Sequence, residues 1–130
     1  MSSATFHLCY SLDSIYISSS ITVLPSSFAY NCFSLKEIII PSNVQTINAT
    51  GFANCYNLQK ITLEEGVQTL GNSCFSGCES LHSITIPKTV SSIGGSCFNN
   101  CYSLAFCDLS ECEMVPTLSG AGFTNTPPGL

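Results

Sequence analysis

Cysteine recurs at one fixed spacing along most of this 130-residue chain, and this period constrains the fold more than any other feature. The column consists of Cys9, Cys32, Cys55, Cys78 and Cys101, each 23 residues after the one before. A leucine stands three residues after each cysteine, from Leu12 to Leu104. Periods of roughly 20–50 residues are typical of solenoids, in which each unit buries its apolar face only against its neighbours.

Two further apolar columns indicate strands. The first contains Ile15, Ile38, Ile61, Ile84 and Cys107, and the second, two residues later, contains Ile17, Ile40, Leu63, Ile86 and Leu109. The alternation in Leu-x-x-Ile-x-Ile predicts a short strand with one face inward. Strands one period apart are then neighbours in a parallel sheet, about 4.8 Å apart. We therefore expect a single solenoid over residues 1–130, with about five units of 23 residues.

The repeat unit resembles the leucine-rich repeats of the BspA-like family. The unit of that family reads roughly I-x-x-x-A-F-x-x-C-x-x-L-x-x-I-x-I-P-x-x-V-x-x-I, and residues 70–87 and 93–104 follow it closely. One departure is Phe28, which stands one residue away from the Phe position. The resemblance implies a right-handed leucine-rich repeat stack, with a short parallel β-sheet on the concave face and irregular or short helical turns on the convex side.

Charged residues are scarce, and this excludes some function classes. The chain has three Lys+Arg and eight Asp+Glu, a formal net charge of −5. Three cations are too few for the basic surface that binds nucleic acid. Because no apolar run approaches the roughly 18 residues of a membrane helix, we expect no membrane insertion.

The start of the chain bears on its location. Residues 1–5 lack the basic residue and the apolar stretch of a signal peptide. The chain opens in the middle of a repeat, so we expect it to be part of a longer array. A cell-surface or secreted location, which the family resemblance implies, then requires a leader in the full-length protein.

The nine cysteines have two interpretations. We expect those of the repeating column to be buried free thiols, because free cysteine behaves as a small hydrophobe. The alternative is disulfides, either along the column or within the pairs Cys74/Cys78 and Cys97/Cys101. Four tetrahedral zinc ligands are not placed by the spacing, so no metal or cofactor is expected. No nucleophile is paired with a base by the period either, so we expect no catalytic residue and no enzyme activity.

The outward positions of the expected strands are the candidate binding site. They are Ser14, Tyr16, Glu37, Ile39, Lys60, Thr62, Ser83, Thr85, Phe106 and Asp108, and they should cover the concave face. Tyr16, Ile39 and Phe106 are large and apolar or aromatic. A rigid sheet that exposes such groups suits contact with a protein ligand. A solvated face with no partner is the alternative.

Three further features have open interpretations. Tyr10, Phe33, Tyr56, Glu79 and Tyr102 form a mostly aromatic column, either a platform for sugar or protein or rings that cover one another along the stack. The first expected strand, Ile15–Ile17, is an open parallel edge, which predicts self-association there. Asn48-Ala49-Thr50 fits the glycosylation acceptor pattern.

The function predicted is a non-catalytic protein-binding or adhesion module of a cell-surface leucine-rich repeat protein. The alternative is an intracellular structural scaffold or a self-assembling repeat protein of the same fold. These two hypotheses differ in compartment rather than in architecture.

Overall fold

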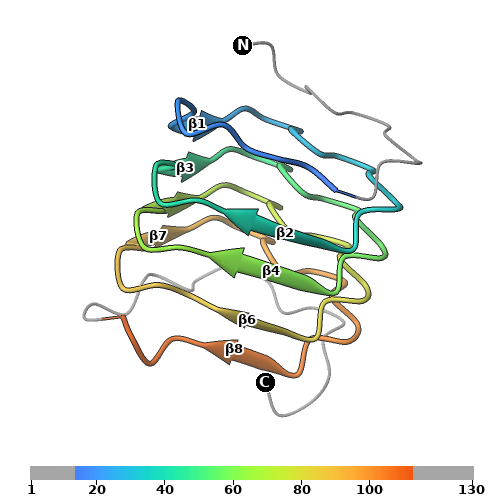
Figure 1. Ribbon diagram of the computed structural model, residues 1–130. Helices are drawn as coiled ribbons and strands as arrows, with labels where there is room; N and C mark the ends of the chain where they lie inside the picture. The colour runs from blue at the N-terminus through green and yellow to red at the C-terminus, as the bar shows by residue number, and fades with distance from the viewer. Residues whose placement is uncertain (1–13, 113–130) are drawn as a thin grey trace.

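A computed structural model describes residues 14–112, which wind into a parallel β-solenoid of about four turns (Figure 1). Successive turns stack so that residues one period apart lie side by side. No helix occurs within residues 14–112. The solenoid predicted from the period is therefore confirmed, with irregular turns rather than helical ones on its convex side.

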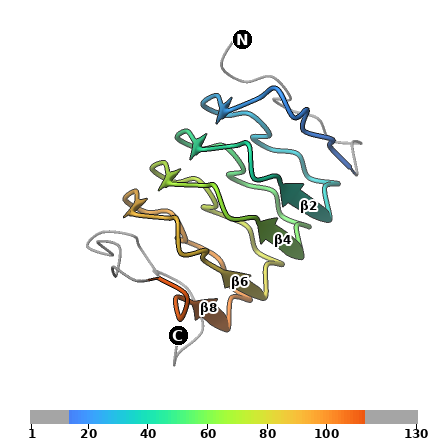
Figure 2. The same ribbon diagram turned by 60° about the vertical axis from the view of Figure 1, so that its left-hand side comes forward.

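Four strands of three or four residues form one side of the stack (Figures 1 and 2). They are β2 (Glu37–Ile40), β4 (Lys60–Leu63), β6 (Ser83–Thr85) and β8 (Phe106–Asp108). Parallel ladders join β2 to β4, with Ile38 beside Ile61, and β6 to β8, with Ile84 beside Cys107. We call the outward surface of these strands, together with Ser14 and Tyr16, the long-strand face.

A proline removes one hydrogen bond where β4 meets β6. The N–H of Glu64 donates to the Ile40 carbonyl at 3.1 Å and closes the β2–β4 ladder. Pro87 occupies the equivalent position one turn later, and proline has no N–H to donate. No ladder joins β4 to β6 within the described residues. The sheet therefore consists of two separate two-stranded ladders that lie next to each other.

The strand predicted at residues 15–17 is wrong. Residues 15–17 run beside β2, but they are not a strand. Pro41 occupies the position of Glu64 one turn earlier, so the closing hydrogen bond to this segment is missing. The alternation persists without the ladder, since Tyr16 is exposed and Ile17 is buried.

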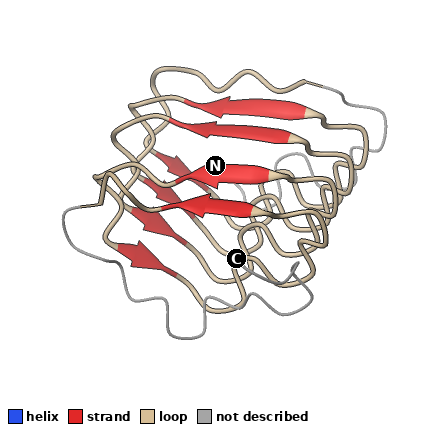
Figure 3. Ribbon diagram, turned by 90° about the horizontal axis from the view of Figure 1, so that it is seen from below, coloured by secondary structure: helices blue, strands red, loops and turns tan. Residues whose placement is uncertain are grey.

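A second sheet, which the spacing of the apolar columns does not predict, forms another side of the stack. Its order is β1 (Val23–Leu24), β3 (Thr46–Ile47), β5 (Thr69–Leu70) and β7 (Ser92–Ile93), all parallel. Figure 3 shows these strands on a different side of the coil from the long strands. The second residue of each strand is buried, as the apolar column at these positions requires. Strands of two residues carry too little alternation to be recognised in a sequence.

The convex side uses tight turns in place of helices. Within a turn, the Cys32 N–H donates to the Ala29 carbonyl at 3.2 Å, while the Phe52 N–H points along the stack to the Cys74 carbonyl at 2.8 Å. This alternation satisfies the backbone without a helix. It requires left-handed backbone at two positions per turn: Ser27 and Asn31, Thr50 and Asn54, Ser73 and Gly77, Ser96 and Asn100.

Stacked aromatic rings fill the core beneath these turns. Phe52 and Phe75 have ring centroids 5.9 Å apart at 13°, and Phe75 and Phe98 repeat the contact at 5.9 Å and 17°. Phe28 meets Phe52 edge-on instead, at 6.1 Å and 66°. The edge-on contact follows from the one-residue displacement of Phe28, since Ala29 occupies the Phe position in that turn. All four rings are buried.

Candidate functional site

The ten predicted site residues share one face of the molecule. All of them lie on the long-strand face and all are exposed. The alternation of each strand turns Ile38, Ile61 and Ile84 inward and leaves their neighbours in solvent. Tyr16 is 90% exposed, Phe106 65% and Ile39 60%, although all three side chains are large. The face therefore offers apolar groups that the fold does not bury.

A hollow of about 520 Å³ lies at the N-terminal end of this face. Tyr16, Ile39 and Pro41 supply apolar surface to it, and Glu37, Lys60 and Thr62 supply polar groups. Glu37 and Lys60 are register partners on β2 and β4, so their opposite charges stand on neighbouring turns. The hollow combines apolar contact area with charges of both signs.

A second hollow of about 500 Å³ lies at the C-terminal end, over β6 and β8. Phe106 and Asp108 line it, together with Ser83 and Thr85. The rings of His82 and Phe106 meet edge-on at 6.1 Å and 73°. Hydrogen bonds from Ser110, first its hydroxyl and then its N–H at 2.9 Å, lower the pKa of the Asp108 carboxyl. Asp108 therefore keeps its charge to lower pH than an ordinary aspartate.

The few charges are distributed unevenly along the face. Lys60 begins β4 and Lys36 directly precedes β2; the N–H of Lys60 donates to the Lys36 carbonyl at 3.3 Å. Asp108 and Glu111 lie at the opposite end, in and after β8. With Glu37 and Glu64 counted, the formal charge is zero at the β2–β4 end (Lys36 and Lys60 against the two glutamates) and −2 at the β8 end.

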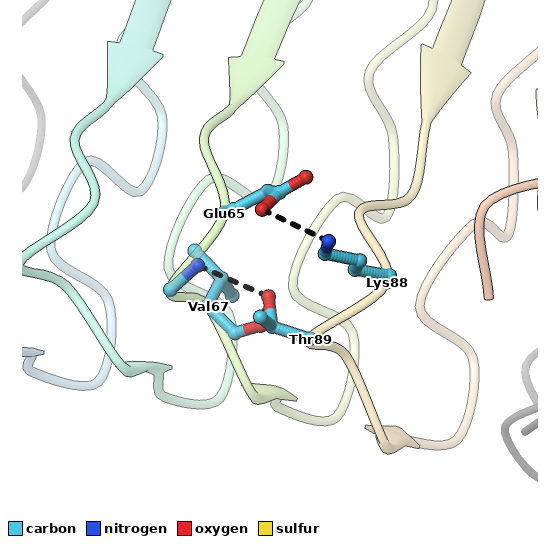
Figure 4. A network of polar contacts seen from close by, with 5 residues as sticks. Glu65, Val67, Lys88 and Thr89 are labelled. Carbon is cyan, nitrogen blue, oxygen red and sulfur yellow. Dashed lines mark hydrogen bonds and ion pairs between the residues drawn. The ribbon is translucent and has the colours of Figure 1, made fainter. Parts of the chain in front are cut away.

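The remaining lysine of the chain is used elsewhere. Lys88 lies 3.7 Å from Glu65, and both side chains are more than half exposed (Figure 4). Beside this pair, the Thr89 hydroxyl donates to the Val67 carbonyl at 2.8 Å and accepts from the Gly66 N–H at 3.0 Å. These contacts join two consecutive turns and leave Lys60 as the cation on the long-strand face, with Lys36 directly beside it.

The repeating cysteines are structural. Cys32, Cys55, Cys78 and Cys101 are buried free thiols, as expected, and Cys9 lies outside the described residues. Each of the last three donates to a carbonyl of the preceding turn at 3.2 Å, which for Cys55 is that of Ala29. Burial raises the pKa of the Cys55 and Cys101 thiols to about 12. Since the thiolate form is the nucleophile and the metal ligand, these protonated thiols are poor nucleophiles and poor metal ligands.

A second set of thiols lies nearby. Cys74 and Cys97 are buried on adjacent turns, and burial, followed by a hydrogen bond with Cys97, raises the pKa of Cys74. The described cysteines are all free, so neither disulfide alternative is present in residues 14–112. The same part of the chain contains no group of three or more His, Cys, Asp or Glu residues arranged to hold a metal ion.

The aromatic column packs along the stack. Phe33 and Tyr56 lie 4.8 Å apart with ring planes at 12°, so each covers one face of the other. This geometry favours packing over a sugar platform for this pair, because the facing ring surfaces are no longer available. Glu79 separates it from Tyr102, which is 52% exposed, and Tyr10 lies outside the described residues.

The family profile and the solved structures that match this chain are all leucine-rich repeat proteins. The sequence profile described as "BspA type Leucine rich repeat region (6 copies)" matches residues 1–126. A leucine-rich repeat protein from Bacteroides ovatus is 33% identical, with a TM-score of 0.78 over 84% of this chain and 28% of its own. One from Eubacterium ventriosum is 24% identical, with a TM-score of 0.60 over 69% of this chain and 26% of its own.

Other comparisons add less. A leucine rich cell surface protein from Faecalibacterium prausnitzii is 24% identical, with a TM-score of 0.38 over 78% of this chain and 40% of its own. No curated protein matches. The chain spans about a quarter of the length of the Bacteroides and Eubacterium proteins. Within residues 14–112, no helix is long and apolar enough to cross a membrane.

Proposed function

The chain belongs to the BspA-type leucine-rich repeat family, and on this premise we propose that it is a non-catalytic protein-binding or adhesion module that acts through the long-strand face. The observation that carries the proposal is that Tyr16, Ile39 and Phe106 are exposed on one face of the stack. Large apolar side chains in solvent are a characteristic of interaction surfaces.

The backbone beneath these side chains supports the same proposal. Ile38, Ile61 and Ile84 anchor the strands in the core directly beside the outward residues. The outward groups are therefore held in place before a partner arrives, which lowers the entropy cost of association. Aromatic residues are enriched where interfaces derive most of their free energy, and Tyr16 and Phe106 are of this kind.

Our proposal for location follows from the family. Proteins of this family that the chain resembles are mostly surface-exposed, so we place the full-length protein at the cell surface. Protease treatment of intact cells tests this: the repeats should be cleaved while a cytoplasmic marker survives. Survival of the repeats until the cells are lysed would favour the intracellular scaffold instead.

Self-association through the N-terminal edge is a second proposal, and the geometry gives it less support. Residues 15–17 are not a strand, so they present a less regular row of hydrogen-bonding groups than an open strand edge would. Sedimentation over a dilution series tests it. A mass that stays at one chain at all concentrations would exclude it.

The proposed function is tested by site-specific photocross-linking in cells that produce the protein naturally. A photoreactive phenylalanine analogue replaces Thr62, at the centre of the long-strand face, or Gln68, which is exposed next to β5. We expect protein adducts at Thr62, none at Gln68, and loss of the Thr62 adducts with Ile39→Lys. Equal adducts at both positions, or none at Thr62, would contradict the proposal.

A further inference from the structure

We propose that the partner segment bound by the long-strand face is an extended polypeptide that lies along the stack axis and crosses β2, β4, β6 and β8. It carries an apolar side chain at each end, an acidic side chain over Lys60 and a basic one beyond Phe106. This inference rests on the proposed function and names the chemistry of its partner. Four properties of the face support it.

The first property is the placement of the apolar groups. Tyr16 and Ile39 lie at the N-terminal hollow, and Phe106 lies at the C-terminal one. Between them the outward side chains are polar: Lys60, Thr62, Ser83 and Thr85. The face therefore has two separate apolar contact points rather than one central patch. A partner needs two apolar side chains at a matching distance.

The second property is that distance. Three inter-turn steps separate β2 from β8, or about 14 Å along the stack at about 4.8 Å per step, and Phe106 is offset sideways from the Ile39 column by two residues of the strand. An extended chain rises about 3.3 Å per residue, so residues four apart span about 13 Å. Residues two and four apart also point to the same side of an extended chain. The apolar side chains of the partner are therefore expected at positions i and i+4.

The third property is the hydroxyl groups between the two contact points. Thr62, Ser83 and Thr85 are exposed, and each hydroxyl can both donate and accept a hydrogen bond. An extended segment has free N–H and C=O groups to offer them. A helix already uses its backbone N–H and C=O groups in internal hydrogen bonds, except at its ends. The centre of the face therefore complements an extended chain better than a helix.

The fourth property is charge. The β2–β4 end carries Lys36 and Lys60 against Glu37 and Glu64, whereas the β8 end carries only the acidic Asp108 and Glu111. An acidic side chain at i+2 faces the protein about 6.6 Å from the first apolar position, near β4 and Lys60. A basic side chain after i+4 approaches Asp108. Because these groups are exposed, they set the direction of the partner more than its affinity.

Fluorescence anisotropy with labelled peptides tests the inference. The matched probe is Leu-Ser-Glu-Ser-Leu-Ser-Lys. The charge-swapped probe is Leu-Ser-Lys-Ser-Leu-Ser-Glu, and the spacing control, Leu-Ser-Glu-Leu-Ser-Ser-Lys, has the same composition with the second leucine one residue earlier. The wild-type chain should bind the matched probe about five-fold more tightly than the charge-swapped one, as two exposed ion pairs allow. The spacing control should bind more weakly than the matched probe.

Variants then assign the charge contact. Lys60→Glu should reverse the preference between the first two probes, and Lys60→Gln should abolish it. Lys88→Glu is the matched control, because Lys88 is equally a surface lysine but pairs with Glu65 away from this face. Lys88→Glu should leave the preference unchanged. Circular dichroism checks that each variant retains the fold.

The outcomes separate this inference from the proposed function. If no probe binds, or if all three bind equally, while the Thr62 cross-link still captures a protein, the extended-peptide inference is wrong and the proposed function stands. If neither probes nor cross-links report binding, both are wrong. A preference that survives Lys60→Glu would also overturn the inference.

Discussion

The buried columns of the turns and the long-strand face share the same 23-residue period. The buried columns repeat similar residues in every turn, whereas the residues of the face change from turn to turn. Phe52, Phe75 and Phe98 repeat one ring contact, and the thiols beside them repeat one hydrogen bond to a carbonyl. In contrast, the outward column of the long-strand face reads Tyr16, Ile39, Thr62, Thr85 and Asp108. The stack depends on the first set, and the second is free to differ.

Packing explains this difference. A side chain in the core touches its own equivalents one turn above and below, so a residue that fits once fits in every turn. An outward side chain mainly meets solvent and its neighbours on the face. Its identity is therefore constrained by strand propensity and by any partner rather than by the stack.

The largest expected effect comes from removing a ring of the buried column. Phe75→Ala leaves a cavity between Phe52 and Phe98 and should lower the free energy of unfolding by about 3–5 kcal/mol. Tyr102→Ala, at a half-exposed ring, should change it by roughly 0.5 kcal/mol or less. Urea denaturation followed by circular dichroism measures both. Similar losses would remove the contrast between column and surface.

A second comparison tests the contrast within a single strand. Ile61 is buried and Thr62 is exposed, although they are adjacent in β4. Ile61→Ala should cost about 2–5 kcal/mol, because it removes buried surface and leaves a cavity. Thr62→Ala should stay within about 0.5 kcal/mol. Thermal unfolding of the two variants measures this difference. Equal decreases in Tm would mean that the register of β4 is wrong.

Alkaline pH should lower the free energy of unfolding through the buried cysteine thiols. The pKa of the Cys55 and Cys101 thiols is about 12 in the fold, against an ordinary value of 9.0. Between these values the unfolded chain releases protons that the folded chain retains, so unfolding becomes easier as the pH rises. The contribution of these two thiols to stability is therefore fully present below pH 9 and is lost as the pH rises toward 12. Each thiol should contribute about 1.4 kcal/mol per pH unit.

Urea denaturation at a series of pH values measures this slope. Cys101→Ala should make the slope shallower by the share of one thiol. Cys112→Ala is the matched control, because Cys112 is only half-buried and should contribute less. A slope that is the same in wild type and Cys101→Ala would contradict the assignment.

The smallest expected effect concerns the surface ion pair. Lys88 and Glu65 lie 3.7 Å apart, with both side chains more than half exposed. A double-mutant cycle with Lys88→Gln and Glu65→Gln should give a coupling energy of about 0.2–1 kcal/mol that decreases in high salt. A coupling of several kcal/mol would show that surface contacts carry more of the stability than the buried columns suggest.

Much of the fold could be predicted because repetition amplifies weak signals. A single Leu-x-x-Ile-x-Ile segment is ambiguous, but its recurrence at one spacing is enough to identify the buried sides of β2, β4 and β6. The exposure of all ten candidate residues follows from the same alternation. Their binding role stays a prediction, because exposure does not identify a partner.

The parts that were not predicted depend on contacts between turns. The period indicated a strand at residues 15–17, but it could not show that no ladder forms between this segment and β2. It also missed β1, β3, β5 and β7, because strands of two residues exist only through pairing with the next turn. The convex turns are helix-free for a related reason, since their N–H groups point alternately along the stack.

The amino-acid order was sufficient for the solenoid, its period, its buried columns and its exposed face, since these depend on which residue types recur at which interval. The tertiary structure was needed for the two separate ladders, the second sheet, the stacked rings of Phe33 and Tyr56, and the two hollows of the long-strand face. These features arise where one turn meets the next. Spacing along the chain specifies which residues are neighbours, whereas the geometry of the stack decides which of their groups bond.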